Sequence, residues 1–137
     1  MKEIAVEVQG LKKSYEKVEA VKGVSFSVSK GELFGLIGPD GAGKTSIFRI
    51  LTTLLFPTDG KVTILGSDVV VDYKKIRTNI GYMPQRFSLY QDLSVEENLT
   101  FFARIFGTTI EENYDLIKDI YVQIEPFKDR LAGKLSG

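Results

Sequence analysis

Cysteine and histidine are both absent from this chain of 137 residues. Without cysteine the chain has no disulfide framework and no thiolate metal site, and without histidine it lacks the commonest general base. It also has no run that approaches the roughly 18 apolar residues of a membrane span. Its first residues, Met1 to Ile4, do not form a secretory signal. These absences predict a cytosolic protein, or one that meets a membrane only through a partner.

The net charge of the chain is zero, because 18 basic residues balance 18 acidic ones. No polyanion such as a nucleic acid is therefore expected as a partner. Hydrophobic residues make up 43% of the chain, whose length is near the commonest size of a single domain. The sequence can thus build a core of its own.

The dominant feature present is a glycine-rich octapeptide that fits the pattern G-x-x-x-x-G-K-[ST] of a phosphate-binding loop. It reads Gly38-Pro39-Asp40-Gly41-Ala42-Gly43-Lys44-Thr45. The apolar residues 33–37 precede it and predict a strand buried on both faces. Apolar residues at helical spacing follow it and predict a helix to about residue 56, stopped by Pro57. Strand, glycine loop and helix are the context that the motif requires, which argues against a glycine-rich turn that binds nothing.

Each residue type in the loop has a chemical reason. The glycines accept strained backbone angles, so consecutive N–H groups can point inward and cradle an anion at the start of a helix. Lys44 suits the β- and γ-phosphates as a mobile point charge, and the Thr45 hydroxyl can bind Mg²⁺. The expected nucleotide-binding set also includes Ser46, which follows the loop.

The remainder of the first 92 residues predicts two kinds of sheet. Residues 4–8 and 24–28 alternate as half-exposed strands, with a polar loop over residues 11–19 between them. Residues 61–65 and 80–83 predict further short strands, and Asp72 can cap a short helix over residues 73–79. The alternating strands suggest an antiparallel sheet, whereas residues 33–37 and 80–83 suggest a covered parallel one.

After about residue 93 the pattern becomes helical. Ser94 and Glu97 form a capping box at the start of one helix, and Thr109 and Glu112 form a second box. The second helix is stopped by Pro126. Helical spacing on the first helix includes Phe102 and Phe106, and these phenylalanines, with Phe101, are predicted to lie in the core.

These motifs, in this order, resemble the ATP-binding domain of ABC transporters over essentially the whole chain. Tyr15 looks like the aromatic residue that stacks on adenine in that family. Gln85 looks like the glutamine that touches Mg²⁺ and the attacking water and relays movement to the membrane partner. Ser136, in the final Leu-Ser-Gly, looks like the signature serine that contacts the γ-phosphate bound on the opposite protomer.

The resemblance implies an α/β P-loop NTPase of the ABC ATPase type. Residues 1–92 would form the nucleotide-binding part with an antiparallel β subdomain, and residues 93–137 the start of a helical subdomain. The implied cofactors are ATP and Mg²⁺, with Thr45 and Gln85 near the metal. The implied partners are a transmembrane permease and a second ABC domain, at the cytoplasmic face of a membrane.

A drug exporter is the expected subfamily. Residues 51–55 and 94–99 are similar to daunorubicin-type export ATPases. Asp40 stands where the family usually has asparagine, which is similar to the first half of tandem two-domain exporters.

The family's catalytic glutamate, Mg²⁺-binding aspartate and switch histidine have no match here. The chain is therefore expected to be the N-terminal part of a truncated domain that binds ATP without hydrolysing it. The strands that lie between residues 33–37 and 80–83 in the family are also missing. Because open strand edges pair with what is available, an oligomer or a rearranged sheet is expected.

Other functions stay open at this point. A soluble ABC ATPase without a transport role, a small P-loop GTPase or kinase, and a non-catalytic nucleotide-binding fragment all fit the phosphate loop. The chain has no guanine-specific N-K-x-D motif, which counts against a GTPase. A kinase explains neither Gln85 nor the Leu-Ser-Gly ending.

Overall fold

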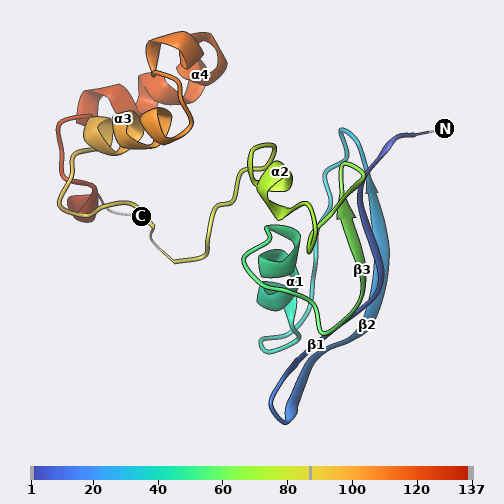
Figure 1. The fold of residues 1–137 in the computed structure, drawn as a ribbon. Helices are drawn as coiled ribbons and strands as arrows, with labels where there is room; N and C mark the ends of the chain where they lie inside the picture. Colours follow the sequence, from blue (N-terminus) through green and yellow to red (C-terminus); the bar gives the residue numbers. More distant parts are fainter. Residues whose placement is uncertain (1, 87, 136–137) are drawn as a thin grey trace. The chain divides into compact units, whose positions relative to one another are not determined.

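The computed structural model describes residues 2–86 and 88–135. The chain divides into two compact units, Met1–Tyr82 and Met83–Gly137, which are described separately below. Figure 1 shows a sheet with two helices in the first unit and mainly helices in the second.

The first unit contains a four-stranded antiparallel sheet in the order β2-β1-β3-β4. Its strands are β1 (Ile4–Tyr15), β2 (Val18–Ser29), β3 (Asp59–Ile64) and β4 (Ser67–Asp68). The predicted antiparallel part is therefore confirmed, and its strands are longer than predicted. The predicted loop over residues 11–19 is wrong, because β1 runs to Tyr15 and turns directly into β2.

A bulge in β1 explains why the second half of this strand cannot be recognised from the alternation of the sequence. The pairing of β1 with β2 shifts register between Val8 and Leu11. Gly10 lies in this interval with φ 56, and its N–H donates to the Ser25 hydroxyl at 2.8 Å. Val8 and Leu11 are both buried although they are three residues apart. An inserted residue of this kind breaks the alternation by which a strand is recognised.

Helices α1 (Lys44–Leu51) and α2 (Tyr73–Arg77) lie on one face of this sheet, as Figure 1 shows. Ile47 and Ile50 from α1 and Ile76 from α2 are buried against the apolar side chains of the strands. The buried core consists of Val8, Leu11, Val21, Ile47, Ile50, Val62, Ile64, Val69 and Ile76.

The α1 helix ends at Leu51, earlier than predicted, and Pro57 is not what stops it. Thr53 has φ 59, which is incompatible with a continuing right-handed helix. The Arg77 guanidinium holds this turn, because it donates to the Thr53 hydroxyl at 2.8 Å and to the Thr53 carbonyl at 2.7 Å. The N–H groups of Thr53 and Leu54 close the end of the helix locally by donating to the carbonyls of Ile50 and Arg49, and Arg77, 24 residues away from Thr53, adds to this turn.

The strands predicted over residues 33–37 and 80–83 are not formed. Phe34 stacks on Phe26 with ring centroids 5.1 Å apart, and Leu36 packs against the core, but Leu33 and Ile37 are fully exposed. An extended segment becomes a strand only when a neighbour pairs with its N–H and C=O groups. Within residues 2–86 and 88–135 neither segment has such a neighbour, and the two do not pair with each other. Pairing with another chain stays a prediction.

The second unit contains α3 (Val95–Ile105) and α4 (Tyr114–Ile124). Three short 3₁₀ turns accompany them: Glu111–Asn113, Glu125–Phe127 and Ala132–Lys134. Both predicted capping boxes are confirmed by reciprocal hydrogen bonds, between Ser94 and Glu97 and between Thr109 and Glu112. The end of α4 just before Pro126 is confirmed too.

Main-chain carbonyls of residues 128 and 130 accept hydrogen bonds from the first N–H groups of α3. The N–H of Val95 donates to the Arg130 carbonyl and that of Glu96 to the Lys128 carbonyl, both at 3.0 Å. Ser94 and Leu131 form an antiparallel bridge beside them. Two of the first-turn donors that a helix normally leaves unpaired are thus satisfied by the main chain, and a third, the Glu97 N–H, donates to the Ser94 hydroxyl.

Asn98 is the buried polar side chain around which the loop before α3 is arranged. Its amide oxygen accepts from the Tyr90 N–H at 2.8 Å, and its amide nitrogen donates to the carbonyls of Tyr90 and Ser94 at 2.9 Å. Phe101 and Phe102 form an aromatic cluster with Tyr90. The prediction of a core position is wrong for Phe101 and Phe106, which are exposed on α3 and at its end, and Phe102 is only half-buried.

Candidate nucleotide-binding site

The glycine loop leads directly into α1 in the first unit. The Ala42 N–H donates to the Pro39 carbonyl at 3.2 Å and closes a turn within the loop. Gly41 and Gly43 have φ of 81 and 86, in the left-handed region that side chains rarely adopt, and α1 begins immediately afterwards at Lys44. The predicted loop and helix start are thus present.

Gly43 must be a glycine for a second reason. A Cβ at this position would lie 2.3 Å from the carbonyl oxygen of Ala20 and 3.0 Å from a methyl group of Val21, both on β2. At Gly41 the same atom would meet nothing within 4 Å. The missing side chain at Gly43 therefore lets the start of α1 pack directly against the sheet.

The start of α1 differs from the start of α3. Gly43 occupies the N-cap position, and no described side chain caps α1. Its first-turn N–H groups, with the positive end of the helix dipole, are therefore available for an anion. Because the cradle is made of main-chain donors beside positive-φ glycines, it fits the phosphate groups of a nucleotide.

The Lys44 side chain folds over the loop. Its ammonium donates to the Pro39 carbonyl at 2.6 Å and to the Gly38 carbonyl. A phosphate oxygen can replace these carbonyls as the partner of the ammonium, so the predicted role of Lys44 fits the geometry. Asp40 in the loop and Thr45 on α1 are exposed residues.

Tyr15 lies beside the same helix start. Its hydroxyl is 3.0 Å from the Ser46 hydroxyl, and the residue is 42% exposed. The structure therefore brings Tyr15 to Ser46 at the start of α1, 31 residues further along the chain. A ring with an exposed surface next to a phosphate cradle is a suitable platform for a nucleotide base.

Lys13 is a neighbour of Tyr15 that no sequence motif identifies. Its ammonium lies 5.3 Å from the centroid of the Tyr15 ring and donates to the Phe56 carbonyl at 2.9 Å. Residues two apart in a strand point to the same face, so the spacing of Lys13 and Tyr15 could have indicated this contact. The prediction of a loop over residues 11–19 excluded that interpretation.

Two predicted site residues are not brought to the loop by these contacts. Gln85 belongs to the second unit, and its role at the metal ion and the attacking water stays a prediction. Ser136 lies outside the described residues, so its signature role is also a prediction.

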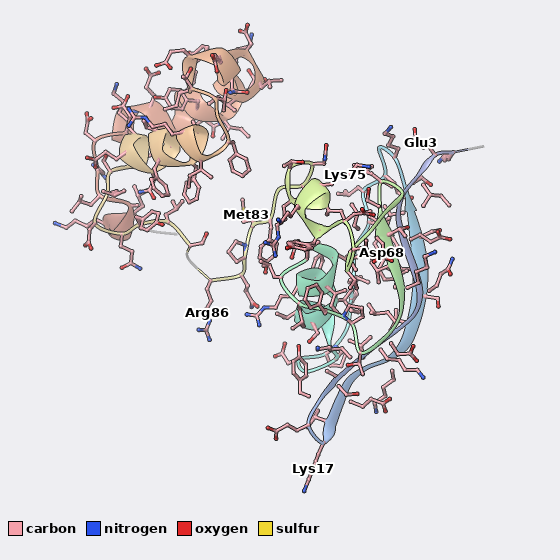
Figure 2. All side chains as sticks on the ribbon, in the orientation of Figure 1. Glu3, Lys17, Asp68, Lys75, Met83 and Arg86 are labelled. Carbon is pink, nitrogen blue, oxygen red and sulfur yellow. The ribbon has the colours of Figure 1, made fainter. Side chains whose placement is uncertain are left out.

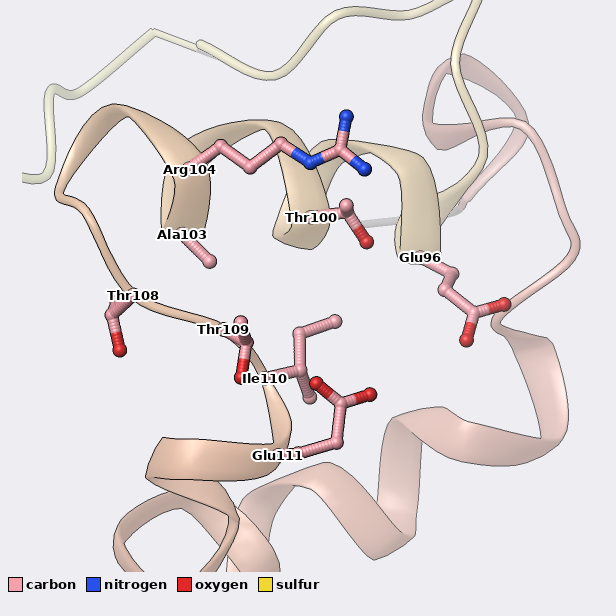
Figure 3. Close-up of a pocket in the computed structure, with 8 residues that line it drawn as sticks. All are labelled: Glu96, Thr100, Ala103, Arg104, Thr108, Thr109, Ile110 and Glu111. Atoms are coloured by element: carbon pink, nitrogen blue, oxygen red, sulfur yellow. The ribbon is translucent and has the colours of Figure 1, made fainter.

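The second unit has a separate cavity of about 270 Å³ between α3 and the segment that precedes α4. Figure 3 shows Glu96 and Arg104 on α3 and Glu111 on the segment that precedes α4. Glu96 also pairs with Lys128 at 3.6 Å. The cavity is lined by side chains of α3 and of residues 108–111 and not by the glycine loop, so it is distinct from the phosphate cradle.

Glycine cradle, uncapped helix start and lysine together define a phosphate-binding loop of the P-loop NTPase class. Comparison with known proteins then identifies the family. The family model described as ABC transporter matches residues 21–137. The chain belongs to this family.

Relatives and solved structures agree with this assignment. The chain is 39% identical to Nod factor export ATP-binding protein I of Rhizobium sp. (strain N33), over 100% of the chain and 46% of that protein. It is 44% identical to a probable multidrug ABC transporter ATP-binding protein of Escherichia coli (strain K12), over 77% of the chain and 18% of that protein. The chain thus spans less than half the length of these relatives.

The fold matches an ATP-binding subunit of an ABC transporter with a TM-score of 0.81 and 27% identity, over 96% of the chain and 56% of that structure. It also matches a dimeric ATP-binding cassette in a post-hydrolysis state bound to ADP and Pi, with a TM-score of 0.80 and 25% identity, over 96% of the chain and 63% of that structure. Within the described residues, no helix has the length and apolar character needed to cross a bilayer.

Proposed function

We propose that this chain is the nucleotide-binding part of an ABC-type exporter ATPase. The observation that carries the proposal is the uncapped start of α1 behind the glycine loop, with Lys44 and Tyr15 beside it. Relatives named for Nod factor export and multidrug transport support the exporter class. The partners would be a transmembrane permease and a second ABC domain, at the cytoplasmic face of a membrane, with no nucleic acid involved.

Each residue has a defined task in this proposal. The main-chain N–H groups of residues 38–46 hold the phosphates, and Lys44 exchanges its carbonyl partners for phosphate oxygens. Thr45 and Gln85 hold Mg²⁺, which neutralises the phosphate charge when bound. Tyr15 stacks on the adenine, and Ser136 reaches the γ-phosphate held by a second ABC domain.

Hydrolysis needs a group that orients or deprotonates the attacking water. Gln85 can orient water but cannot act as a base, and these 137 residues contain no histidine. We therefore propose that this chain alone binds Mg-ATP without sustained turnover.

Calorimetry with Mg-ATP tests the binding site. Wild-type protein should bind, and Lys44→Ala should lose most of the affinity because the phosphates lose a direct charge partner. Lys75→Ala is the matched control, since this exposed lysine lies on α2 rather than at the loop (Figure 2). Equal affinity in wild type and Lys44→Ala would refute the phosphate assignment.

Phosphate release tests the second part of the proposal. Purified wild-type protein should release phosphate from ATP no faster than Lys44→Ala, because we expect no carboxylate of this chain to stand where it could activate the attacking water. Sustained release that depends on Lys44 would show that another group in these residues activates water.

A further inference from the structure

Lys13 makes two contacts that connect the end of β1 with the loop that follows α1. Its half-buried side chain donates to the Phe56 carbonyl at 2.9 Å, and its ammonium lies 5.3 Å from the centroid of the Tyr15 ring. A lysine ammonium at this distance is attracted by the negative face of the ring. One cation therefore links the ring to the main chain of a second segment.

Further contacts hold the same strand end. The Ser14 N–H donates to the Thr58 hydroxyl at 3.0 Å, and the Thr58 N–H donates to the Lys12 carbonyl at 2.9 Å. On the other side, the Tyr15 hydroxyl is 3.0 Å from the Ser46 hydroxyl on α1. The ring is thus held by its hydroxyl end and by the ammonium near its π-system, on a strand end that Thr58 bonds through Lys12 and Ser14, while 42% of the residue stays exposed.

We propose that Lys13 is a positioning residue for the nucleotide base, acting through Tyr15. The inference rests on the proposed function and deepens it. By fixing the ring before a base arrives, Lys13 reduces the ordering cost of binding. A cation near the ring also draws electron density from it, which favours stacking of an electron-rich purine on the accessible surface.

This role differs from that of a general phosphate-attracting charge. Lys13 should affect ligands that carry a base and leave a bare polyphosphate unaffected. Lys44 should affect both, because it acts on the phosphates.

The experiment compares the affinities of Mg-ATP and Mg-tripolyphosphate by calorimetry. Lys13→Met should weaken ATP binding about two- to fivefold, the range of an exposed cation–π contact, and leave tripolyphosphate binding unchanged. Lys13→Gln, which keeps a donor for the Phe56 carbonyl but removes the charge, should resemble Lys13→Met. Lys13→Arg should retain ATP affinity, since a guanidinium also stacks on an aromatic ring.

Lys12→Met is the matched control. Lys12 is the neighbouring residue, but its ammonium pairs with Asp59 at 3.6 Å, and its loss should leave the affinity for both ligands unchanged. In a Tyr15→Ala background, Lys13→Met should have no further effect on ATP binding, because its target is gone.

Unchanged ATP affinity in Lys13→Met would overturn the inference, as would an equal loss for both ligands. Persistence of the Lys13→Met effect without Tyr15 would also overturn it. Wild-type protein that binds neither ligand would refute the proposed function and this inference together, whereas intact tripolyphosphate binding with no effect at Lys13 would refute only the inference.

Discussion

Replacing Gly43 by alanine tests whether the glycine loop depends on close packing as well as on backbone freedom. An alanine in the left-handed region costs about 1–2 kcal/mol. This cost applies to Gly41→Ala and Gly43→Ala alike, because both residues have positive φ. Gly41→Ala should lose about this amount and no more, since its Cβ would meet open space.

Gly43→Ala carries a second cost. Its Cβ would lie 2.3 Å from the Ala20 carbonyl oxygen, which belongs to β2 and cannot turn away as a flexible side chain could. The start of α1 must shift, and overpacking of this kind typically costs a further 1–3 kcal/mol or so. The expected total is about 2–5 kcal/mol, a large share of the stability of a small domain.

Urea unfolding followed by circular dichroism measures both variants, with β-sheet signal reporting on the first unit. Gly43→Ala should reduce the free energy of unfolding two to three times as much as Gly41→Ala. The same loss in both variants would refute the argument from packing, because backbone strain alone predicts equality.

Two further predictions concern the second unit. Asn98→Ala should cost about 1–3 kcal/mol in urea unfolding, because it removes a buried amide that bonds the Tyr90 N–H and the carbonyls of Tyr90 and Ser94; an unchanged midpoint would contradict this. Burial, followed by the charge of Glu96, raises the pKa of Tyr121, and Glu96 raises the pKa of Lys128. Both groups therefore hold their protons more tightly when folded. The stability that they contribute is complete below their ordinary pKa values of about 10 and is lost as pH rises through the folded values. Thermal unfolding across this range should show a steeper alkaline loss in wild type than in Tyr121→Phe.

Features that depend on neighbours in sequence could be predicted from the sequence. The phosphate loop follows from glycine and lysine spacing, and the capping boxes follow from side chains three residues apart. Ser94 with Glu97 and Thr109 with Glu112 form the predicted bonds because these bonds need only the local turn.

Features that depend on distant partners could not be predicted in the same way. Residues 33–37 have the composition of a buried strand, but a strand also requires a paired neighbour, which composition does not supply. The bulge at Gly10 obscures the second half of β1, and no local pattern indicates that Arg77 contacts Thr53 at the end of α1. The Tyr15–Ser46 contact likewise becomes visible only once the hairpin is folded onto α1.

The start of α3 depends on hydrogen-bond acceptors that are synthesised after the helix itself. Val95 and Glu96 donate to carbonyls of Arg130 and Lys128, which leave the ribosome roughly 35 residues later. At a synthesis rate of about 5–20 residues per second, the carbonyls that accept from these N–H groups are synthesised about 2–7 s after the N–H groups themselves. During that interval α3 has only its own capping box, and a helix of this length is marginal in water without tertiary contacts. The second unit can therefore complete its fold only after its last segment has emerged.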